Sequence, residues 1–113
     1  MNIRFGEIYW LEILAPVGHE YMKKRPFVVV DQETFIARNA VICAVPLTKN
    51  LEKRGIYDVT IPKDASNALF YDSTARIADL NSFDKSRFKR YIGTANKEIM
   101  RVIMEKVQKR FSF

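Results

Sequence analysis

The sequence predicts a mainly β domain, in which five to seven short strands curl into a small half-open barrel and one C-terminal helix packs on it. Segments rich in aromatic and β-branched residues recur between turns over most of the chain, as they do in small barrels. After Gly93 the apolar spacing becomes a helical stripe, formed by Ile99, Val102, Ile103, Val107 and Phe111. Together these observations indicate a β-barrel plus a C-terminal helix.

The elements can be placed in order along the chain. We expect strands at residues 5–14, 27–31, 40–46, 57–61, 68–71, 74–80 and 88–92, and a helix at 95–111. The first strand is apolar on both faces, and Pro46 should end the third because proline cannot donate to a ladder. Loops or turns are expected at 15–26, 31–39, 49–55, 62–67 and 81–87. Thr94 is the expected N-cap of the helix.

Length and cysteine usage bound the class of protein. At 113 residues, positions 1–113 should form one domain with one core. The single cysteine, Cys43, excludes an intramolecular disulfide and a multi-cysteine metal site, and its apolar surroundings favour core packing. There is neither a secretory signal pattern nor an apolar run long enough to span a bilayer. We therefore expect a cytoplasmic protein with no membrane contact.

The net charge of +6 is distributed unevenly. Residues 1–82 hold 10 Lys/Arg and 10 Asp/Glu, whereas residues 83–113 hold 9 Lys/Arg and 3 Asp/Glu. Such an asymmetry favours an anionic partner, either nucleic acid or an acidic polypeptide. Much of it is also explained by the solvated face of the helix, where Arg101, Glu105 and Lys109 can form i,i+4 pairs.

The most informative stretch is residues 16–30, which reads PVGHEYMKKRPFVVV. It opens with turn-forming residues, continues with a histidine beside a carboxylate and three cations, and ends in an apolar strand. Its residues of chemical interest are His19, Glu20, Lys23, Lys24 and Arg25. A polar, cationic loop anchored to a rigid strand is typical of a site. Composition alone favours the simpler interpretation, a solvated hairpin loop.

The order of motifs along nearly the whole chain resembles the MazF/PemK (Kid-like) toxin family of type II toxin–antitoxin systems. The most specific part is a P-x-x-G-x-E-x-x-x-x-R-P block before a hydrophobic strand, matched over residues 16–30. The weaker matches are a strand opening at residues 6–9, a strand end at 46–48, a segment at 82–88 and a step at 92–94.

This resemblance implies an SH3-like half-open barrel of the CcdB/PemK type. It implies an endoribonuclease that cuts single-stranded RNA at short sequences, with no metal and no cofactor. It also implies a homodimer and a cognate antitoxin whose acidic tail covers the RNA groove. Arg25 and Thr48 match the residues assigned to catalysis in the MazF branch, and His19 and Arg76 match residues used by the PemK branch.

The chain departs from the family pattern after Arg76. The aspartate position of an R-x-D-Q motif holds Ala78, and Asp79 follows one residue late. Asn81 stands where an arginine is common. Asp79 could still act as a base in place of the displaced aspartate, but these departures leave the cleavage sequence and the rate open.

Cutting RNA without a metal uses the substrate's own 2′-OH as nucleophile and leaves a 2′,3′-cyclic phosphate and a 5′-OH. The reaction needs a base, an acid and cations for the charge that builds on phosphorus. Arg25 suits the third task, because a guanidinium is planar and always charged. Thr48 can donate one hydrogen bond to a phosphate oxygen. His19 titrates near neutrality unaided and is a candidate proton shuttle.

Each candidate also has a structural interpretation. His19 can be an ordinary loop histidine, Glu20 a salt-bridge partner of Arg25, and Thr48 a strand-end cap. Trp10 can stack on bases, but its place in the first strand favours core packing. The expected substrate-binding residues, which can equally be solvated, are Glu20, Lys23, Lys24 and Lys49.

Two rival functions keep the fold but change the activity. One is a CcdB-like toxin that inhibits DNA gyrase through its C-terminal helix. The complete G-x-E…R-P block argues against this function, because a protein inhibitor would not need it. The other is a barrel that binds RNA without cutting it. The second rival predicts salt-sensitive binding to RNA that is recovered intact.

Overall fold

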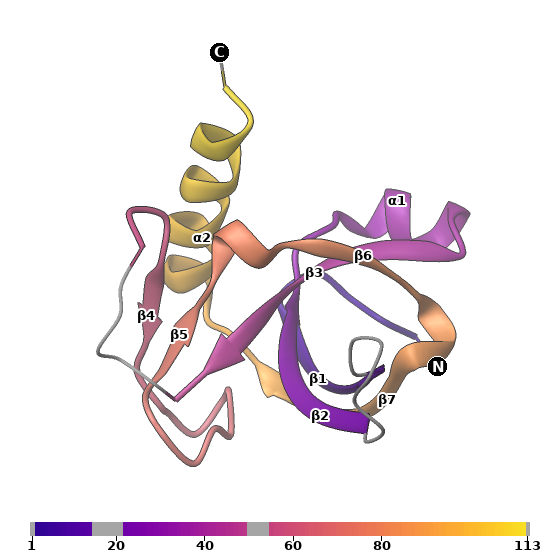
Figure 1. Cartoon of the computed structure of the whole chain (residues 1–113), viewed down its shortest axis with the longest axis horizontal. Helices are drawn as coiled ribbons and strands as arrows, with labels where there is room; N and C mark the ends of the chain where they lie inside the picture. The colour runs from indigo at the N-terminus through magenta and orange to yellow at the C-terminus, as the bar shows by residue number, and fades with distance from the viewer. Residues whose placement is uncertain (1, 15–21, 50–54, 113) are drawn as a thin grey trace.

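The computed structural model describes residues 2–14, 22–49 and 55–112, and it consists of a curled antiparallel sheet with a long helix beside it (Figure 1). The strands are β1 (Glu7–Leu14), β2 (Met22–Val29), β3 (Val41–Thr48), β4 (Val59–Ile61), β5 (Ser73–Ala75), β6 (Asn81–Asp84) and β7 (Phe88–Thr94). The helices are α1 (Glu33–Arg38) and α2 (Lys97–Arg110), and 3-10 turns lie at η1 (Ile77–Asp79) and η2 (Lys85–Arg87). The predicted fold class is confirmed.

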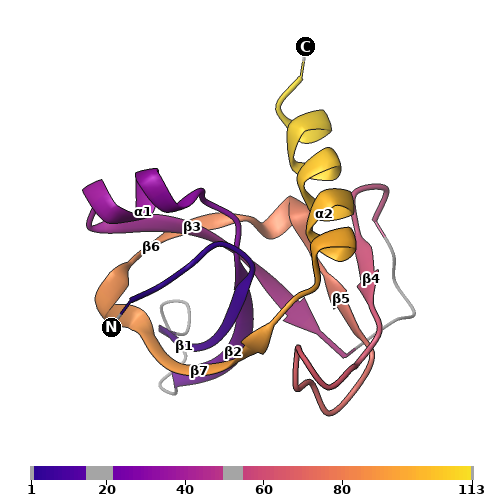
Figure 2. The same cartoon turned by 180° about the vertical axis from the view of Figure 1, so that it is seen from behind.

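The sheet has seven strands in the order β4-β5-β3-β2-β1-β7, and β6 pairs with β3 outside this path. Every strand pair is antiparallel. Figures 1 and 2 show β1, β2, β3, β6 and β7 as a ring, with α2, β4 and β5 to one side of it. The strand β1 is central to the ring, because it pairs with β2 on one edge and with β7 on the other.

Two apolar clusters fill the two sides of the sheet. Alternation along β1 divides them: Tyr9 and Leu11 join the cluster inside the ring, whereas Ile8 joins the cluster beneath α2. Inside the ring, Phe88 meets Tyr9 edge to face, with 5.8 Å between ring centroids. The cluster beneath α2 includes Ile103 of that helix, which is fully buried. The short helix α1 lies over the ring on the side away from α2.

Pro26 and Pro46 lie inside strands in the structure. The sequence instead predicts that one strand begins after Pro26 and that another ends at Pro46. Strand β2 begins at Met22 rather than at residue 27, and Pro26 lies opposite Trp10 in the β1–β2 ladder. In the other direction β2 pairs with β3 only from Phe27 onward, so no strand requires the missing N–H of Pro26 on that side. Strand β3 continues through Pro46 because its last two residues leave β2 and pair with β5.

Four further segments differ from the prediction. Residues 68–71 form a loop and not a strand, since Ala68 has a left-handed φ of 55°. The predicted loop at 31–39 contains α1, whose Ile36 is buried as an anchor while Phe35 stays 44% exposed. The predicted turn at 81–87 contains β6, in which Phe83 pairs with Ile42 of β3. The predicted strand at 74–80 shortens to β5 and continues as η1.

The helix α2 begins two residues later than predicted. Its N-cap is Asn96, not Thr94, because the Asn96 side chain accepts a hydrogen bond of 2.8 Å from the N–H of Ile99. Thr94 instead belongs to β7. Phe111, predicted on the apolar stripe, lies at the C-cap and is 57% exposed. The stripe therefore ends before Phe111.

The solvent face of α2 carries the expected charge pairs. Arg101 forms ion pairs with Glu98 one turn before it and with Glu105 one turn after it. The Arg101 guanidinium holds the pKa of the Glu98 carboxyl below its ordinary value, through a hydrogen bond and through its charge. Within the described residues, neither helix is long and apolar enough to cross a membrane.

Candidate functional site

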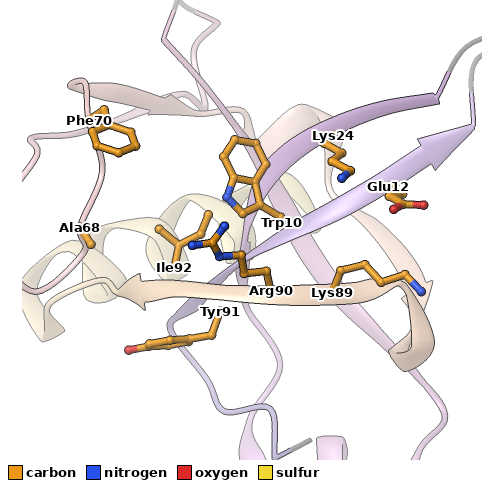
Figure 3. A pocket seen from close by; sticks show the side chains of 9 residues that line it. All are labelled: Trp10, Glu12, Lys24, Ala68, Phe70, Lys89, Arg90, Tyr91 and Ile92. Carbon is orange, nitrogen blue, oxygen red and sulfur yellow. The ribbon is translucent and has the colours of Figure 1, made fainter.

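An open groove lies between β1, β2 and β7 on one side and the loop of residues 62–72 on the other. It consists of two adjoining cavities of about 730 Å³ and 440 Å³. The residues shared by both cavities are Trp10, Lys24, Ala68, Phe70 and Ile92. Figure 3 shows the larger cavity, with Phe70 on the loop at one side, Trp10 of β1 on the other, and Arg90 of β7 beside Trp10. We refer to the two cavities together as the groove.

Arg25 and Thr48, the pair singled out in the sequence, both line the smaller cavity. The last β2–β3 pair is Phe27 with Pro46, and two residues further along these strands are Arg25 and Thr48. Beyond this pair β3 turns toward β5, where Leu47 lies opposite Ala75. The cavity therefore lies where β2 and β3 separate, and the two side chains come from the two diverging strands.

The groove is strongly cationic. The described residues that line it include five cations, which are Lys24, Arg25, Lys49, Lys89 and Arg90. Glu12 is the one carboxylate among the described lining residues. Five positive charges against one negative charge give a potential that attracts anions, and most strongly at low salt. The positive charge of the groove comes from β2, from the end of β3 and from β7, not from α2.

One wall of the groove is a loop fixed by Asn67, whose side chain is buried. The Asn67 Oδ1 accepts hydrogen bonds of 3.0 Å from the N–H groups of Asp64 and Leu69. Its Nδ2 donates to the carbonyl of Pro62 at 2.9 Å, and its N–H donates to Asp64 Oδ1 at 2.7 Å. One side chain thus satisfies backbone groups on both sides of the turn, which fixes the course of the chain that leads to Phe70.

Aromatic side chains alternate with the cations around the groove. The ammonium group of Lys49 lies over the ring of Tyr71, 5.1 Å from its centroid, which is a cation–π distance. Phe70 is 84% exposed. The expectation that Trp10 packs in the core is wrong: Trp10 is half-buried and lines both cavities. Strand alternation explains this, because Tyr9 and Leu11 face the ring and Trp10 faces the opposite side.

Arg76 and Asp79 lie apart from Arg25 and Thr48. They form an ion pair with each other, with 3.2 Å between Arg76 Nε and Asp79 Oδ2, although Nε makes no hydrogen bond of good geometry. Neither residue lines the groove. They belong to the η1 segment, which packs against α2 and whose Ala78 carbonyl accepts from Arg110 at 3.4 Å. The structure does not bring these two candidates to Arg25.

The remaining candidates from the sequence are His19, Glu20, Lys23, Lys24 and Lys49. His19 and Glu20 fall outside the described residues. Lys23 lies in β2 opposite Ile13, and Lys24 lies opposite Glu12 in the same ladder. Lys24 and Lys49, both expected to bind substrate, line the groove.

The groove residues that sequence reasoning missed include Phe70, Lys89 and Arg90. The segment around Phe70 reads as a strand in the sequence, so its exposure is not foreseen there. Lys89 and Arg90 precede the helix in the same basic region, where the solvated helix accounts for most of the charge. Only the structure gives the signal, which is the register: Arg90 on β7 lies directly opposite Trp10 on β1.

The motif at residues 82–88 has a structural role. Asp84 caps η2 by accepting a hydrogen bond of 2.9 Å from the N–H of Ser86, and this bond lowers the pKa of its carboxyl. Arg87 Nη1 donates to the carbonyl of Glu12 at 3.1 Å. The segment thereby ties η2 to β1 and carries the chain from β6 into β7.

Other reactive side chains lie away from the groove. Cys43 is half-buried on β3, with its Sγ 3.3 Å from the hydroxyl of Ser82. Tyr9 donates its hydroxyl to Glu7 Oε1 at 3.0 Å, and its pKa is raised, first by burial and then by that hydrogen bond. In the part of the chain that the structure describes, no group of three or more His, Cys, Asp or Glu side chains is arranged to hold a metal ion.

The fold and groove define a small half-open β-barrel with a cationic, aromatic groove and a packed C-terminal helix. The sequence model of the PemK-like, MazF-like toxins of type II toxin–antitoxin systems matches residues 4–111. The chain belongs to this family. No sequence among curated proteins matches the chain significantly.

Solved structures share the fold at low sequence identity. MazF from Deinococcus radiodurans is 19% identical, with a TM-score of 0.79 over 100% of this chain and 99% of that one. A mycobacterial endoribonuclease in complex with its cognate antitoxin is 17% identical, with a TM-score of 0.76 over 98% of each chain. The Mycobacterium tuberculosis toxin MazF-mt6 is 19% identical, with a TM-score of 0.71 over 93% of this chain and 95% of that one.

Proposed function

We propose that this chain is an endoribonuclease toxin that cuts single-stranded RNA at short sequences without a metal. The observation that carries the proposal is that Arg25 and Thr48 line one cationic cavity at the point where β2 and β3 separate. It is supported by the family membership and by structural neighbours described as endoribonucleases.

In the proposed reaction the 2′-oxygen of the substrate attacks the adjacent phosphorus and the bond to the 5′-oxygen breaks. The base takes the proton of the 2′-OH, the leaving 5′-oxygen takes up a proton from solvent water, and the products are a 2′,3′-cyclic phosphate and a 5′-OH. Arg25 binds the non-bridging phosphate oxygens and stabilises the charge that grows on them. Thr48 donates a hydrogen bond to one of those oxygens.

The base that takes the 2′-OH proton is assigned to His19. Asp79, the competing candidate, is paired with Arg76 and does not line the groove. A guanidinium is a poor base, so Arg25 is better suited to binding phosphate. A histidine is the side chain whose ordinary charge change falls nearest neutrality, and His19 precedes β2, the strand that carries Arg25, in the sequence.

The proposed partners follow from the charge of the groove. The groove carries an excess of positive charge, which suits RNA during catalysis and an acidic antitoxin during inhibition. Neighbours of the fold have been solved with their antitoxins. We also propose that the toxin is a homodimer and that it acts in the cytoplasm, where its RNA substrates are.

The test is incubation of the purified protein with a long single-stranded RNA in EDTA, followed by mapping of fragment ends. The proposal expects discrete cuts that carry 2′,3′-cyclic phosphate and are absent with Arg25→Ala. Arg38→Ala is the matched control, because Arg38 is an exposed arginine on α1 and does not line the groove. RNA that stays intact across varied sequences would overturn the proposal, and a DNA gyrase assay would then be the next measurement.

A further inference from the structure

The loop that borders the groove presents two neighbouring aromatic side chains to solvent. Phe70 is 84% exposed and Tyr71 is 60% exposed. Tyr71 is engaged by the ammonium group of Lys49. Among the described residues, no cation lies over the ring of Phe70, so a cation–π contact does not explain where that ring lies. Exposed large apolar groups beside a cavity are typical of a binding surface.

The exposure of Phe70 is imposed by the backbone around it. Before Phe70, Asn67 fixes the turn, and the carbonyl of Ser66 accepts a hydrogen bond of 2.9 Å from the N–H of Thr94. After Phe70, the hydroxyl of Ser73 donates to the carbonyl of Tyr71 at 3.0 Å. The chain is therefore tied down on both sides, and the ring is presented without a further entropic cost of ordering the loop.

Trp10 forms the wall that faces Phe70. Both side chains line both cavities, and Figure 3 shows them on opposite sides of the space between the loop and β1. Tyr91 is not a third member of this slot. Its ring packs on Tyr9, with 5.7 Å between centroids, and its hydroxyl is hydrogen-bonded to Thr94 at 2.7 Å.

The rim of this slot is cationic. Arg90 lies opposite Trp10 in the β1–β7 ladder, and Lys24 and Lys89 line the same cavity. A slot between two aromatic side chains suits a flat π-system, and cations at its rim suit the phosphates attached to it. A nucleotide in a single strand carries both features. A second copy of this chain, with its own positive charge of +6, is a poorer match to a cationic surface.

We propose that Trp10 and Phe70 hold one nucleobase of a single-stranded RNA between them, next to the phosphate bound by Arg25 and Thr48. This inference rests on the proposed function and names the residues that grip a base beside the scissile bond. Stacking tolerates any base, so the slot contributes affinity and positions the strand. The phosphate at the adjoining cavity is thereby placed for attack.

Trp10 is the single tryptophan of the chain, so its fluorescence reports on this site alone. The probe is a short 2′-O-methyl RNA oligonucleotide, which cannot be cut because its 2′-oxygen is blocked. A matched series replaces each nucleotide in turn with an abasic one, which keeps the phosphates but removes the base. Phe70→Ala tests the slot and Phe70→Tyr conserves the ring. Phe111→Ala, an exposed phenylalanine at the end of α2, is the control.

The proposal expects the intact oligonucleotide to quench Trp10 and one abasic position to abolish most of that quenching. Phe70→Ala should weaken binding by about 5- to 150-fold, the range for removal of one base–aromatic stack. In Phe70→Ala, an abasic nucleotide at the same position should weaken binding little further, because the stack is already lost. Phe111→Ala should bind the intact oligonucleotide as the wild type does. Phe70→Tyr should restore binding.

Three results would overturn it. The first is unchanged binding in Phe70→Ala, and the second is an abasic series that quenches as well as the intact strand. The third is a lower sedimentation mass for Phe70→Ala, which would assign the loop to a contact between copies. The cleavage assay separates these outcomes from failure of the proposed function. Cutting by the wild type with unaffected Phe70→Ala binding rejects only the slot, whereas intact RNA rejects the nuclease.

Discussion

The backbone of Gly93 on β7 lies directly against the backbone of Asn67 in the loop that forms one wall of the groove. A Cβ on Gly93 would lie 2.4 Å from the carbonyl oxygen of Asn67 and 2.7 Å from that of Ser66. No rearrangement of a flexible side chain could relieve such a contact, because the neighbouring atoms belong to backbone that Asn67 itself holds in place. This close approach joins the loop directly to β7.

Gly93→Ala should therefore destabilise the fold by about 2–4 kcal/mol, as for overpacking that forces backbone to move. The free energy of unfolding in urea measures this. Gly55→Ala is the matched control, because among the described residues the nearest atom to its Cβ would be in the Asp58 side chain, at 3.6 Å. Equal stability of the two variants would contradict the described packing of the loop on β7.

The interaction of Arg25 with phosphate should depend on the shape of the guanidinium and not only on its charge. Arg25→Lys keeps one positive charge but loses the planar fork, so kcat/KM for RNA cleavage should fall at least about 10-fold. Arg38→Lys on α1 makes the same chemical change away from the groove and should leave cleavage unchanged. Full activity of Arg25→Lys would mean that Arg25 acts only as a distant charge.

Several parts of the fold could be predicted from the sequence because they depend on local signals. The aromatic and β-branched run of β1, the hydrophobic end of β2 and the stripe of α2 all appear within a dozen residues. The pairing of β6 with β3 could not be predicted in this way. Its sequence, NSFD, is polar and mostly exposed, so only long-range hydrogen bonding makes it a strand.

The candidate site was predictable only in part, for a similar reason. Arg25 and Thr48 were found through a resemblance in motifs, and the register of β2 and β3 explains why these two positions meet. Phe70 and Arg90 carry no motif. The place of Phe70 in the groove depends on how Asn67 and Gly93 join the loop to β7, and that of Arg90 depends on the β1–β7 ladder. Both are contacts between distant parts of the sequence.

Lys89 should bind RNA through phosphate alone. When a protein makes one phosphate interaction fewer with a single strand, the slope of log K against log salt becomes shallower by about 0.7. Lys89→Ala should therefore reduce the slope by about that amount, with an uncleavable 2′-O-methyl RNA as ligand. Lys109→Ala, an exposed lysine on α2 outside the groove, should leave the slope unchanged. Equal slopes for both variants would contradict a phosphate interaction at Lys89.

The buried hydroxyl of Tyr9 should make the fold sensitive to alkali. Its pKa is raised above the ordinary value near 10, mainly by burial and then by its hydrogen bond to Glu7. Above pH 10 the unfolded chain releases this proton while the folded chain retains it. Stability should therefore be fully present below pH 10 and fall as the pH rises, by at most about 1.4 kcal/mol per pH unit from this group.

Urea unfolding of wild type and Tyr9→Phe at pH 9 and at pH 11 isolates this contribution, because the lysines titrate equally in both proteins. Tyr9→Phe should lose less stability than wild type between the two pH values. Tyr91→Phe is the matched control, since Tyr91 lies next to Tyr9 but is 50% exposed. If Tyr9→Phe loses as much stability as wild type, ionisation of Tyr9 does not oppose folding and its hydroxyl is accessible to water.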